Sequence, residues 1–330
     1  MVFINKFVEL KNRYNKGTIF SKVGFWGSAA SIIALLLTVF FFFLSSSKNH
    51  FTPDLTNTIQ PYIIEIKENH FEVFSRYKNT LWIQEISGNI VKGNVVDLDN
   101  DGKNEVIIGV GSRGDDTGKI LCFSANGELI WEFNTTGSFN YEGGRSDKLM
   151  VRNFEIVNLF DSEKKQIVIL SIDSQGWYQS RLCIIDSRGK LISSYWHPGH
   201  IHYLAVGSLI DSYPRKIIVG GINNDLSPYS KGIGYLYTVF MLDPNNIYGE
   251  APPYFGNLGK GTHVWYGKIL PKGLGINRFE LLDQNADGFN EICVWTSKGH
   301  VFYLNFNGEV VGTGKSDGTE GFAKFELYEK

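Results

Sequence analysis

The sequence predicts an all-β fold, a β-propeller of about five four-stranded blades, preceded by one transmembrane helix. Three observations predict it: an apolar run near the N-terminus, a strand–turn–strand pattern that recurs through the rest of the chain, and a composition with 14% aromatic residues. Aromatic side chains pack well on a pleated sheet, so we expect few helices outside the membrane. The chain has 330 residues, 43% of them apolar, which is enough to bury a sizeable core.

The N-terminal region predicts a membrane anchor. Residues 1–22 carry five basic side chains and one acid, and the run 23–44 contains no charge. At about 1.5 Å per residue this run can cross a hydrocarbon core of about 30 Å. The basic flank predicts a cytoplasmic tail, and a polar linker at 45–60 leads to a periplasmic or extracellular domain on the inner or plasma membrane. A cleaved signal peptide is the alternative, because the serines at 45–47 resemble a cleavage site.

The net charge argues against a nucleic-acid-binding protein, and the cysteine content argues against a domain held together by disulfides. The formal net charge is −2, whereas a nucleic-acid-binding domain usually carries a basic stripe, so we expect no nucleic-acid partner. The three cysteines stand in apolar runs and are expected to be buried thiols. An odd number of cysteines in an exported domain also argues against a disulfide framework.

Two units recur over residues 61–330. The outer unit is an apolar strand, a polar turn and a second strand, and its copies lie at 71–86, 120–133, 181–196, 239–249 and 301–311. The inner unit is a strand, an acidic or polar loop and a strand, and its copies lie at 95–110, 156–170, 206–221 and 281–295. Asn-Gly turns in two outer units favour tight hairpins. Joined together, the units give the four strands of a propeller blade.

The first copy has no recognisable inner unit. We therefore predict that the ring closes when the C-terminal segment near 321–330 pairs with the N-terminal strands near 62–66, because closure removes exposed sheet edges. A two-sheet sandwich is the alternative arrangement.

Two inner loops have the composition of calcium sites. Residues 97–105 and 283–291 both place oxygen-bearing side chains at positions 1, 3, 5 and 9, a glycine at position 6 and a backbone carbonyl at position 7. Alternating oxygens of this kind surround a hard cation, and glycine permits the sharp turn. The predicted ligands are Asp97, Asp99, Asp101, Lys103 (carbonyl) and Glu105, and Asp283, Asn285, Asp287, Phe289 (carbonyl) and Glu291. An acidic β-turn without metal is the alternative.

This pattern resembles the FG-GAP or VCBS repeat of integrin-α-type propellers, in which such loops join two strands of a blade and bind calcium. The resemblance covers about residues 60–330 as a repeat, and it is specific only at the two acidic loops. It implies two Ca²⁺ ions, for which we expect a structural role. The inner loops at 158–166 and 208–216 depart from the ligand pattern, so we predict that they bind no metal.

A second set of polar and aromatic residues predicts a ligand face. His197, His200 and His202 precede or begin an inner strand and could bind Zn²⁺ or Cu²⁺, contact a ligand near the propeller channel, or simply pack. Arg152 falls at the register of His202. Arg145, Trp196, Trp265 and Arg278 are expected between blades, where they could contact a sugar or peptide.

These features predict a membrane-anchored, calcium-binding module that binds a protein, a glycan or an envelope component. We expect no enzymatic activity, because no nucleophile or zinc motif accompanies the repeats. A calcium-dependent carbohydrate-active enzyme and a structural subunit of an envelope complex are the alternatives.

Overall fold

The computed structural model describes residues 60–111, 117–137, 148–160, 162–173, 179–210, 214–224, 236–247, 263–270 and 274–315, which belong to one compact unit, 59–330. The predicted transmembrane helix at 23–44 and Arg145 lie outside these residues. Within the described part, no helix is long and apolar enough to cross a membrane.

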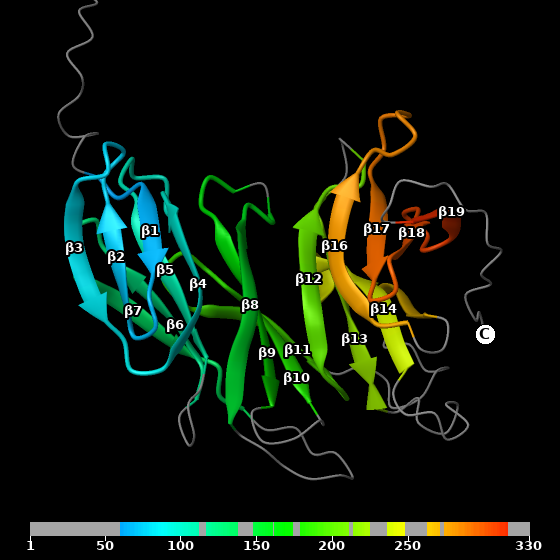
Figure 1. Cartoon of the computed structure of the whole chain (residues 1–330), viewed down its shortest axis with the longest axis horizontal. Coiled ribbons are helices and arrows are strands. Elements are labelled where there is room, and N and C mark those ends of the chain that lie inside the picture. Colours follow the sequence, from blue (N-terminus) through cyan, green and yellow to red (C-terminus); the bar gives the residue numbers. More distant parts are fainter. Residues whose placement is uncertain are drawn as a thin grey trace, which may run out of the picture. The chain divides into compact units, whose positions relative to one another are not determined.

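The described strands form five antiparallel sheets, and in each sheet the strands follow one another in chain order. We call the sheets blades 1 to 5 (Figure 1). Blade 1 contains β1 (Ile63–Ile66), β2 (His70–Phe74) and β3 (Thr80–Glu85); blade 2 contains β4 (Asn89–Val96), β5 (Glu105–Gly111), β6 (Lys119–Phe123) and β7 (Leu129–Asn134). Blade 3 contains β8 (Leu149–Val157), β9 (Gln166–Asp173), β10 (Ser180–Ile185) and β11 (Leu191–His197). Blade 4 contains β12 (Ile201–Gly207), β13 (Lys216–Asn223), β14 (Leu236–Leu242) and β15 (His263–Ile269), and blade 5 contains β16 (Ile276–Leu282), β17 (Glu291–Thr296), β18 (His300–Leu304) and β19 (Val310–Lys315).

Consecutive blades pack against one another through their inner strands. Contacts join β1 to β4, β5 to β8, β8 to β12 and β12 to β16. This sequence of antiparallel meanders is the arrangement of successive β-propeller blades, and it differs from the two sheets of a sandwich. The predicted hairpins and inner units are confirmed, except that the last strand of blade 4, β15, begins at His263 and not directly after the turn near residue 245.

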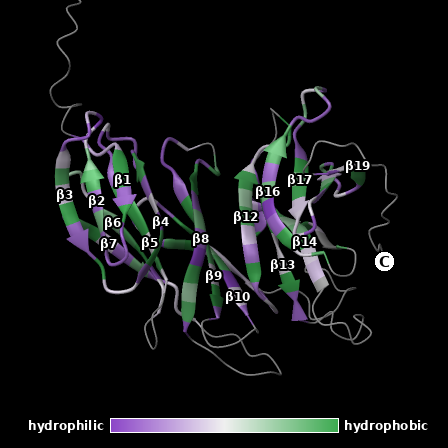
Figure 2. Cartoon of the chain, in the orientation of Figure 1, coloured by the Kyte–Doolittle hydropathy of each residue, from purple (hydrophilic) through white to green (hydrophobic). Residues whose placement is uncertain are grey.

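The core lies between the blades. The second strand of each four-stranded blade is buried along most of its length. In blades 2, 3 and 4 it lies between two neighbouring blades. One apolar cluster joins blades 1 and 2, a second joins blades 2 and 3, and a third joins blades 3, 4 and 5. Figure 2 shows hydrophobic residues alternating with hydrophilic ones along the strands, and hydrophilic residues at many of the turns. Each fully buried Ile or Val contributes about 1.5–3 kcal/mol to folding.

Three tryptophans on outermost strands bind the next blade. Each indole N–H donates to a carbonyl at the same position of the next blade's hairpin turn: Trp82 to Ala125 at 2.9 Å, Trp131 to Ser187 at 3.1 Å, and Trp265 to Phe306 at 2.9 Å. The first two rings also lie against the turn glycines, so that a Cβ on Gly127 would come within 2.9 Å of Trp82, and one on Gly189 within 2.8 Å of Trp131. The indoles therefore join blade 1 to blade 2, blade 2 to blade 3, and blade 4 to blade 5.

Blade 1 has three strands within the described part of the chain, and none of them occupies the innermost position. Trp82 on β3 is equivalent to Trp131 on β7, so β2 and β3 correspond to the outer hairpin of blade 2, and β1 corresponds to β5. The segment 321–330, which we predict to close the ring here, lies outside the described residues.

Candidate functional site

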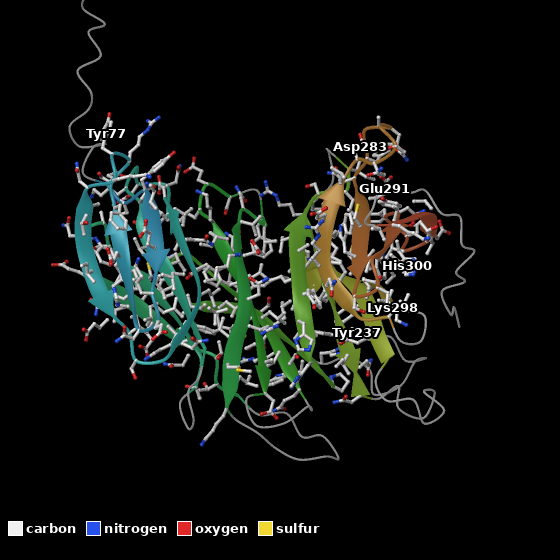
Figure 3. The ribbon with its side chains drawn as sticks, viewed as in Figure 1. Tyr77, Tyr237, Asp283, Glu291, Lys298 and His300 are labelled. Atoms are coloured by element: carbon white, nitrogen blue, oxygen red, sulfur yellow. The ribbon has the colours of Figure 1, made fainter. Side chains whose placement is uncertain are left out.

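The two acidic loops have the same backbone conformation. Position 4 has a positive φ in both, 63° at Asn100 and 59° at Ala286, and so does the glycine at position 6, 83° at Gly102 and 88° at Gly288. Such angles suit glycine and tolerate asparagine, whereas alanine adopts them at a cost. Figure 3 shows Asp283 and Glu291 at the β16–β17 loop, at the opposite end of blade 5 from Lys298.

Hydrogen bonds within the loops use matching atoms. The carboxylate at position 1 accepts from the backbone N–H groups of positions 5 and 6, at 3.2 and 3.0 Å in the first loop and 3.1 and 2.9 Å in the second. The glutamate at position 9 accepts from the N–H of position 2, from Leu98 to Glu105 at 2.8 Å and from Gln284 to Glu291 at 2.9 Å. The backbone thus orients both acids.

The first loop brings three carboxylates together. Oxygen atoms of Asp97, Asp99 and Glu105 all lie within 4.8 Å of one another, the only such group of acidic, histidine or cysteine side chains among the described residues. Oδ1 of Asp99 is buried and has no hydrogen-bond partner. Burial raises the pKa of Glu105; the N–H of Leu98 opposes this increase, and the charges of Asp99, Asp101 and Asp97 add to it. A cation would supply the missing partner and relieve the repulsion.

Hydrogen bonds of a side-chain amide close the loop at 158–166 in blade 3. Its N–H at position 2, on Leu159, donates to Gln166 Oε1 at 2.8 Å, as in the acidic loops. Gln166 Nε2 then donates to the Ser162 hydroxyl at 3.1 Å and to the Lys164 carbonyl at 2.8 Å. Those two oxygens occupy positions 5 and 7, which are ligand positions in the acidic loops. An amide at position 9 can therefore donate hydrogen bonds to the oxygens of positions 5 and 7, whereas an ionised glutamate has no hydrogen to donate.

The second acidic loop is partly satisfied by its own amide. Asn285 Nδ2, at position 3, donates to Asp287 at 2.9 Å and to Glu291 at 3.3 Å, while its Oδ1 accepts from the N–H of Asp287 at 2.9 Å. The amide thus occupies the space between the two carboxylates, as the Gln166 amide does between the oxygens of the blade 3 loop. A half-turn that presented the Asn285 oxygen to a cation would give up the bond from the Asp287 N–H.

In blade 4 a lysine occupies position 9. Lys216 is 6% exposed, and its ammonium lies 3.1 Å from Asp243. Burial favours a raised pKa at Asp243, but hydrogen bonds from Lys216 and from the N–H of Asn245 outweigh it and hold the pKa below its usual 3.8. The charge of this lysine is therefore neutralised by a partner within its own blade.

Position 8 links each loop to the preceding blade. Its side chain donates to a backbone carbonyl at the equivalent loop or segment of that blade: Asn104 to Pro61 at 2.9 Å, Lys165 to Asp97 at 2.6 Å, Arg215 to Asn158, and Asn290 to Ser208 at 3.0 Å. In two cases the position-8 N–H also donates to the carbonyl of position 2, from Lys165 to Leu98 at 3.0 Å and from Asn290 to Leu209 at 2.8 Å. We call this series of bonds the loop ladder. Sequence reasoning missed it, although Asn recurs at position 8 of both acidic loops.

The histidines separate into two environments. His197 is fully buried, its Nε2 lies 3.2 Å from the Ile222 carbonyl, and its ring stacks on Phe240. His200 and His202 lie edge to face, with ring centroids 5.8 Å apart. Because the three rings do not converge on one point, the arrangement favours packing at His197 over a three-histidine metal site.

Arg152 and His202 occupy the same place in neighbouring blades. Each is the extra residue of a β-bulge in the innermost strand, at Val151/Asn153 in β8 and at Ile201/Tyr203 in β12. Burial lowers the pKa of His202 to about 4, and the charges of Arg152 and His200 contribute. Bulges redirect side chains and are frequent at binding sites. The structure thus groups three of the residues predicted for the ligand face.

Three other predicted ligand residues, Trp196, Trp265 and Arg278, lie in strands, whereas the sequence predicts them between blades. Trp196 in β11 is covered by the guanidinium of Arg181, 5.2 Å from its ring centroid. Trp265 is 9% exposed and binds the turn of blade 5. Arg278 lies 4.4 Å from the ring centroid of Trp295 and pairs with Glu280 at 3.3 Å. Each of these side chains therefore makes a contact that stabilises the fold.

A pocket of about 330 Å³ opens beside the second acidic loop. It lies between this loop, the position-2 and position-3 residues of the blade 4 loop, and the β18–β19 turn. Its lining residues are Leu209, Ile210, Asn285, Asp287, Phe289, Asn290, Glu291, Asn305, Phe306, Asn307 and Val311. Sequence reasoning did not anticipate it, because the three segments are distant in the chain.

Comparison with known proteins gives similarity of fold only. No protein-family model matches the chain, and no curated protein matches it. Among solved structures, the Dos1 propeller has a TM-score of 0.49 at 12% identity over 78% of this chain and 55% of that chain. BamB from Moraxella catarrhalis has a TM-score of 0.37 at 12% identity, covering 78% and 72%. A europium-containing methanol dehydrogenase has a TM-score of 0.46 at 12% identity, covering 77% and 49%.

The chain therefore spans about half the length of the first of these structures. At such scores and identities none of the three carries an argument about activity, ligand or partner. The account of the blades rests on their own strand order and packing.

Proposed function

We propose that the protein is a membrane-anchored, calcium-binding β-propeller of the FG-GAP/VCBS type, whose exported domain binds a protein, a glycan or an envelope component. One observation carries the calcium proposal. In blade 3 the inner loop is closed by hydrogen bonds from the Gln166 amide. The equivalent loop of blade 2 brings the carboxylates of Asp97, Asp99 and Glu105 together, and Asp99 Oδ1 has no hydrogen-bond partner.

Calcium has a structural role in this proposal. The ion draws the oxygens of one loop together, and the loop ladder connects that loop to the neighbouring blade. Exported modules commonly hold calcium with dissociation constants of roughly 10⁻⁴–10⁻³ M, so extracytoplasmic calcium is sufficient to fill such sites. The anchor is inferred from the apolar run 23–44 and its basic flank.

Binding, not catalysis, is the function that the geometry favours. The grouped residues offer hydrogen-bond donors, Arg152 and His202 from inner strands and His200 from the residue directly before β12. His202, with its pKa lowered to about 4, is a poor general acid near neutral pH. We therefore assign this group to ligand contact.

The calcium proposal is tested by thermal unfolding of the full-length chain in detergent, with 1 mM Ca²⁺ or with a chelator. Wild type should unfold several degrees higher in calcium, since a ligand at ten times its dissociation constant stabilises by about 1.4 kcal/mol. The Asp99→Ala, Asp287→Ala double variant should lose the difference. Gln166→Ala, at position 9 of the cation-free loop, is the control: its unfolding temperature should fall equally in both buffers. Equal unfolding of wild type with and without calcium would refute the proposal.

A further inference from the structure

The innermost strands of blades 2 to 5 each contain a β-bulge at the same place. The register shifts at Ile90/Lys92 in β4, Val151/Asn153 in β8, Ile201/Tyr203 in β12 and Ile276/Arg278 in β16. The residue before each bulge is a buried Ile or Val. The extra residues, each at least partly exposed, are Val91, Arg152, His202 and Asn277. The fold therefore repeats one bulge four times and varies the side chain that the bulge presents.

Arg152 and His202 occupy inner strands that pack against each other, because contacts join β8 to β12. Both bulges lie near the beginning of their strands, whereas the acidic loops follow the ends of β4 and β16. The pair is therefore distinct from the candidate calcium loops.

Arg152 is the inner-strand cation without a partner in the described part of the chain. The four innermost strands contain three Lys or Arg residues. Lys92 pairs with Glu155 at 2.8 Å, and Arg278 pairs with Glu280 at 3.3 Å. Arg152 is exposed and forms neither an ion pair nor a hydrogen bond with another described residue. Its charge is available to a ligand.

His202 supplies a second polar group beside this cation. Its Nδ1 is buried without a hydrogen-bond partner, and no hydrogen bond joins either ring nitrogen to another described residue. The ring lies edge to face with His200 at 5.8 Å and with Tyr203 at 6.1 Å between centroids. The two neighbouring rings orient the imidazole and leave it free to bond a ligand.

Charge indicates which group the pair accepts. Burial, with the charges of Arg152 and His200, lowers the pKa of His202 to about 4, and no carboxylate opposes this change. The imidazole is therefore neutral near pH 7, and the guanidinium supplies one positive charge. A carboxylate carries one negative charge and presents two oxygens to the planar guanidinium, whereas a phosphate monoester carries about 1.5 to 2 negative charges. The pair matches a carboxylate.

We propose that Arg152 and His202 bind a carboxylate group of the ligand, with the guanidinium on both oxygens and an imidazole N–H on one of them. The inference rests on the proposed binding function of the exported domain and names the chemical group that its inner strands recognise. Acidic sugars and peptide ends both carry such a group, and the choice of probes distinguishes these two sources.

The test follows the imidazole NMR signals of the full-length chain in a neutral detergent, at pH 7 and in saturating Ca²⁺. The His202 signal is the one that is missing in His202→Gln. The probes are methyl glucuronoside and acetylglycine, their neutral counterparts methyl glucoside and acetylglycinamide, and phenyl phosphate as a more highly charged comparison. We expect at least one carboxylate to shift the His202 signal in a saturable way, and we expect neither neutral counterpart to do so.

Three variants identify the guanidinium. Arg152→Gln should weaken carboxylate binding about ten-fold or more, because the charged partner is lost. It should keep the unfolding temperature of wild type, because Arg152 is exposed. Arg152→Lys keeps the charge without the planar fork and should bind with intermediate affinity. Arg278→Gln removes a guanidinium that pairs with Glu280 outside the proposed site, and it should leave binding unchanged.

The outcomes separate this inference from the calcium proposal. A carboxylate that binds wild type and is lost in Arg152→Gln supports the inference, and the probe that binds identifies a sugar or a peptide as the source. The inference is overturned if neither carboxylate shifts the His202 signal, if a neutral counterpart shifts it equally, if phenyl phosphate binds more tightly, or if Arg152→Gln binds as wild type does. None of these results changes the calcium dependence of unfolding, which tests the calcium proposal by itself.

Discussion

Position 9 of the inner loops determines how each loop is closed. Glu105 and Glu291 have no hydrogen to donate when they are ionised, whereas the Gln166 amide donates two hydrogen bonds. Lys216 forms an ion pair with Asp243. The sequence alone identified the acidic positions, because their spacing is a local property. It did not reveal that Gln166 binds the oxygens of positions 5 and 7, because that depends on a side-chain orientation set by the fold.

Substituting Glu105→Gln should convert the first loop to the closure seen in blade 3. The new amide can donate to Asp101 and to the Lys103 carbonyl, and the variant loses one of four clustered negative charges. We expect the unfolding temperature in chelator to rise by about 2–4 °C and the effect of calcium on this loop to disappear. Calorimetry of this variant and of the surface control Glu128→Gln checks the prediction. A lower unfolding temperature in chelator would contradict it.

The same glutamate should make the calcium-free protein sensitive to pH. The pKa of Glu105 is raised in the folded state, so the folded protein holds this proton more tightly than the unfolded chain does. The resulting stability is fully present below the usual pKa of 4.5 and is lost as pH rises through the folded pKa. Chemical denaturation in chelator, compared with Glu105→Gln, should show this loss only in wild type. Identical pH profiles would refute the raised pKa.

His202 should produce the opposite pH dependence. Its pKa is lowered to about 4 from 6.5, so its contribution to stability is full above pH 6.5 and is lost as pH falls toward 4. In His202→Gln that loss should be absent. Stability measured from pH 7 to pH 4 in saturating calcium isolates this effect, and parallel curves for the two proteins would be evidence against it.

At the scale of elements, the sequence predicts what is local and misses what joins blades. The hairpins and the inner units were correct because Asn-Gly turns and alternating apolar residues act within a few residues. The indole bonds of Trp82, Trp131 and Trp265, and the loop ladder, join segments that are 41 to 82 residues apart. The sequence predicts Trp265 as a ligand residue because its bond partner, Phe306, is 41 residues away in the chain. Its equivalence to the other two indoles is visible only with the blades in place.

The indole contact can be measured by a double-mutant cycle. Gly189→Ala should destabilise the protein strongly, since its Cβ would lie 2.8 Å from Trp131 and its φ is +76°. The same change should cost less in the Trp131→Ala background, where only the backbone strain remains. We expect a coupling of about 1 kcal/mol or more in urea denaturation. Additive effects would indicate that the ring does not constrain the turn.

At the scale of the whole molecule, closure of the ring is still a prediction. Blade 1 has the equivalents of the outer three strands of blade 2, and β1 is hydrogen-bonded to β2 alone among the described strands. If the segment 321–330 pairs with β1, a chain ending at Lys315 should show faster amide exchange in Ile63–Ile66 and a greater tendency to aggregate. Unchanged exchange in these four residues would show that another segment covers β1.

The loop ladder also has a consequence for how the domain comes apart. Each rung connects only nearest neighbours. The two acidic loops belong to blades 2 and 5, which the predicted closure of the ring would place on either side of blade 1, while blades 3 and 4 close their loops with an amide and a lysine. Scarcity of calcium would then loosen the blades beside the closure and leave blades 3 and 4 intact, so the domain would open first where the ring closes, and not in one cooperative collapse.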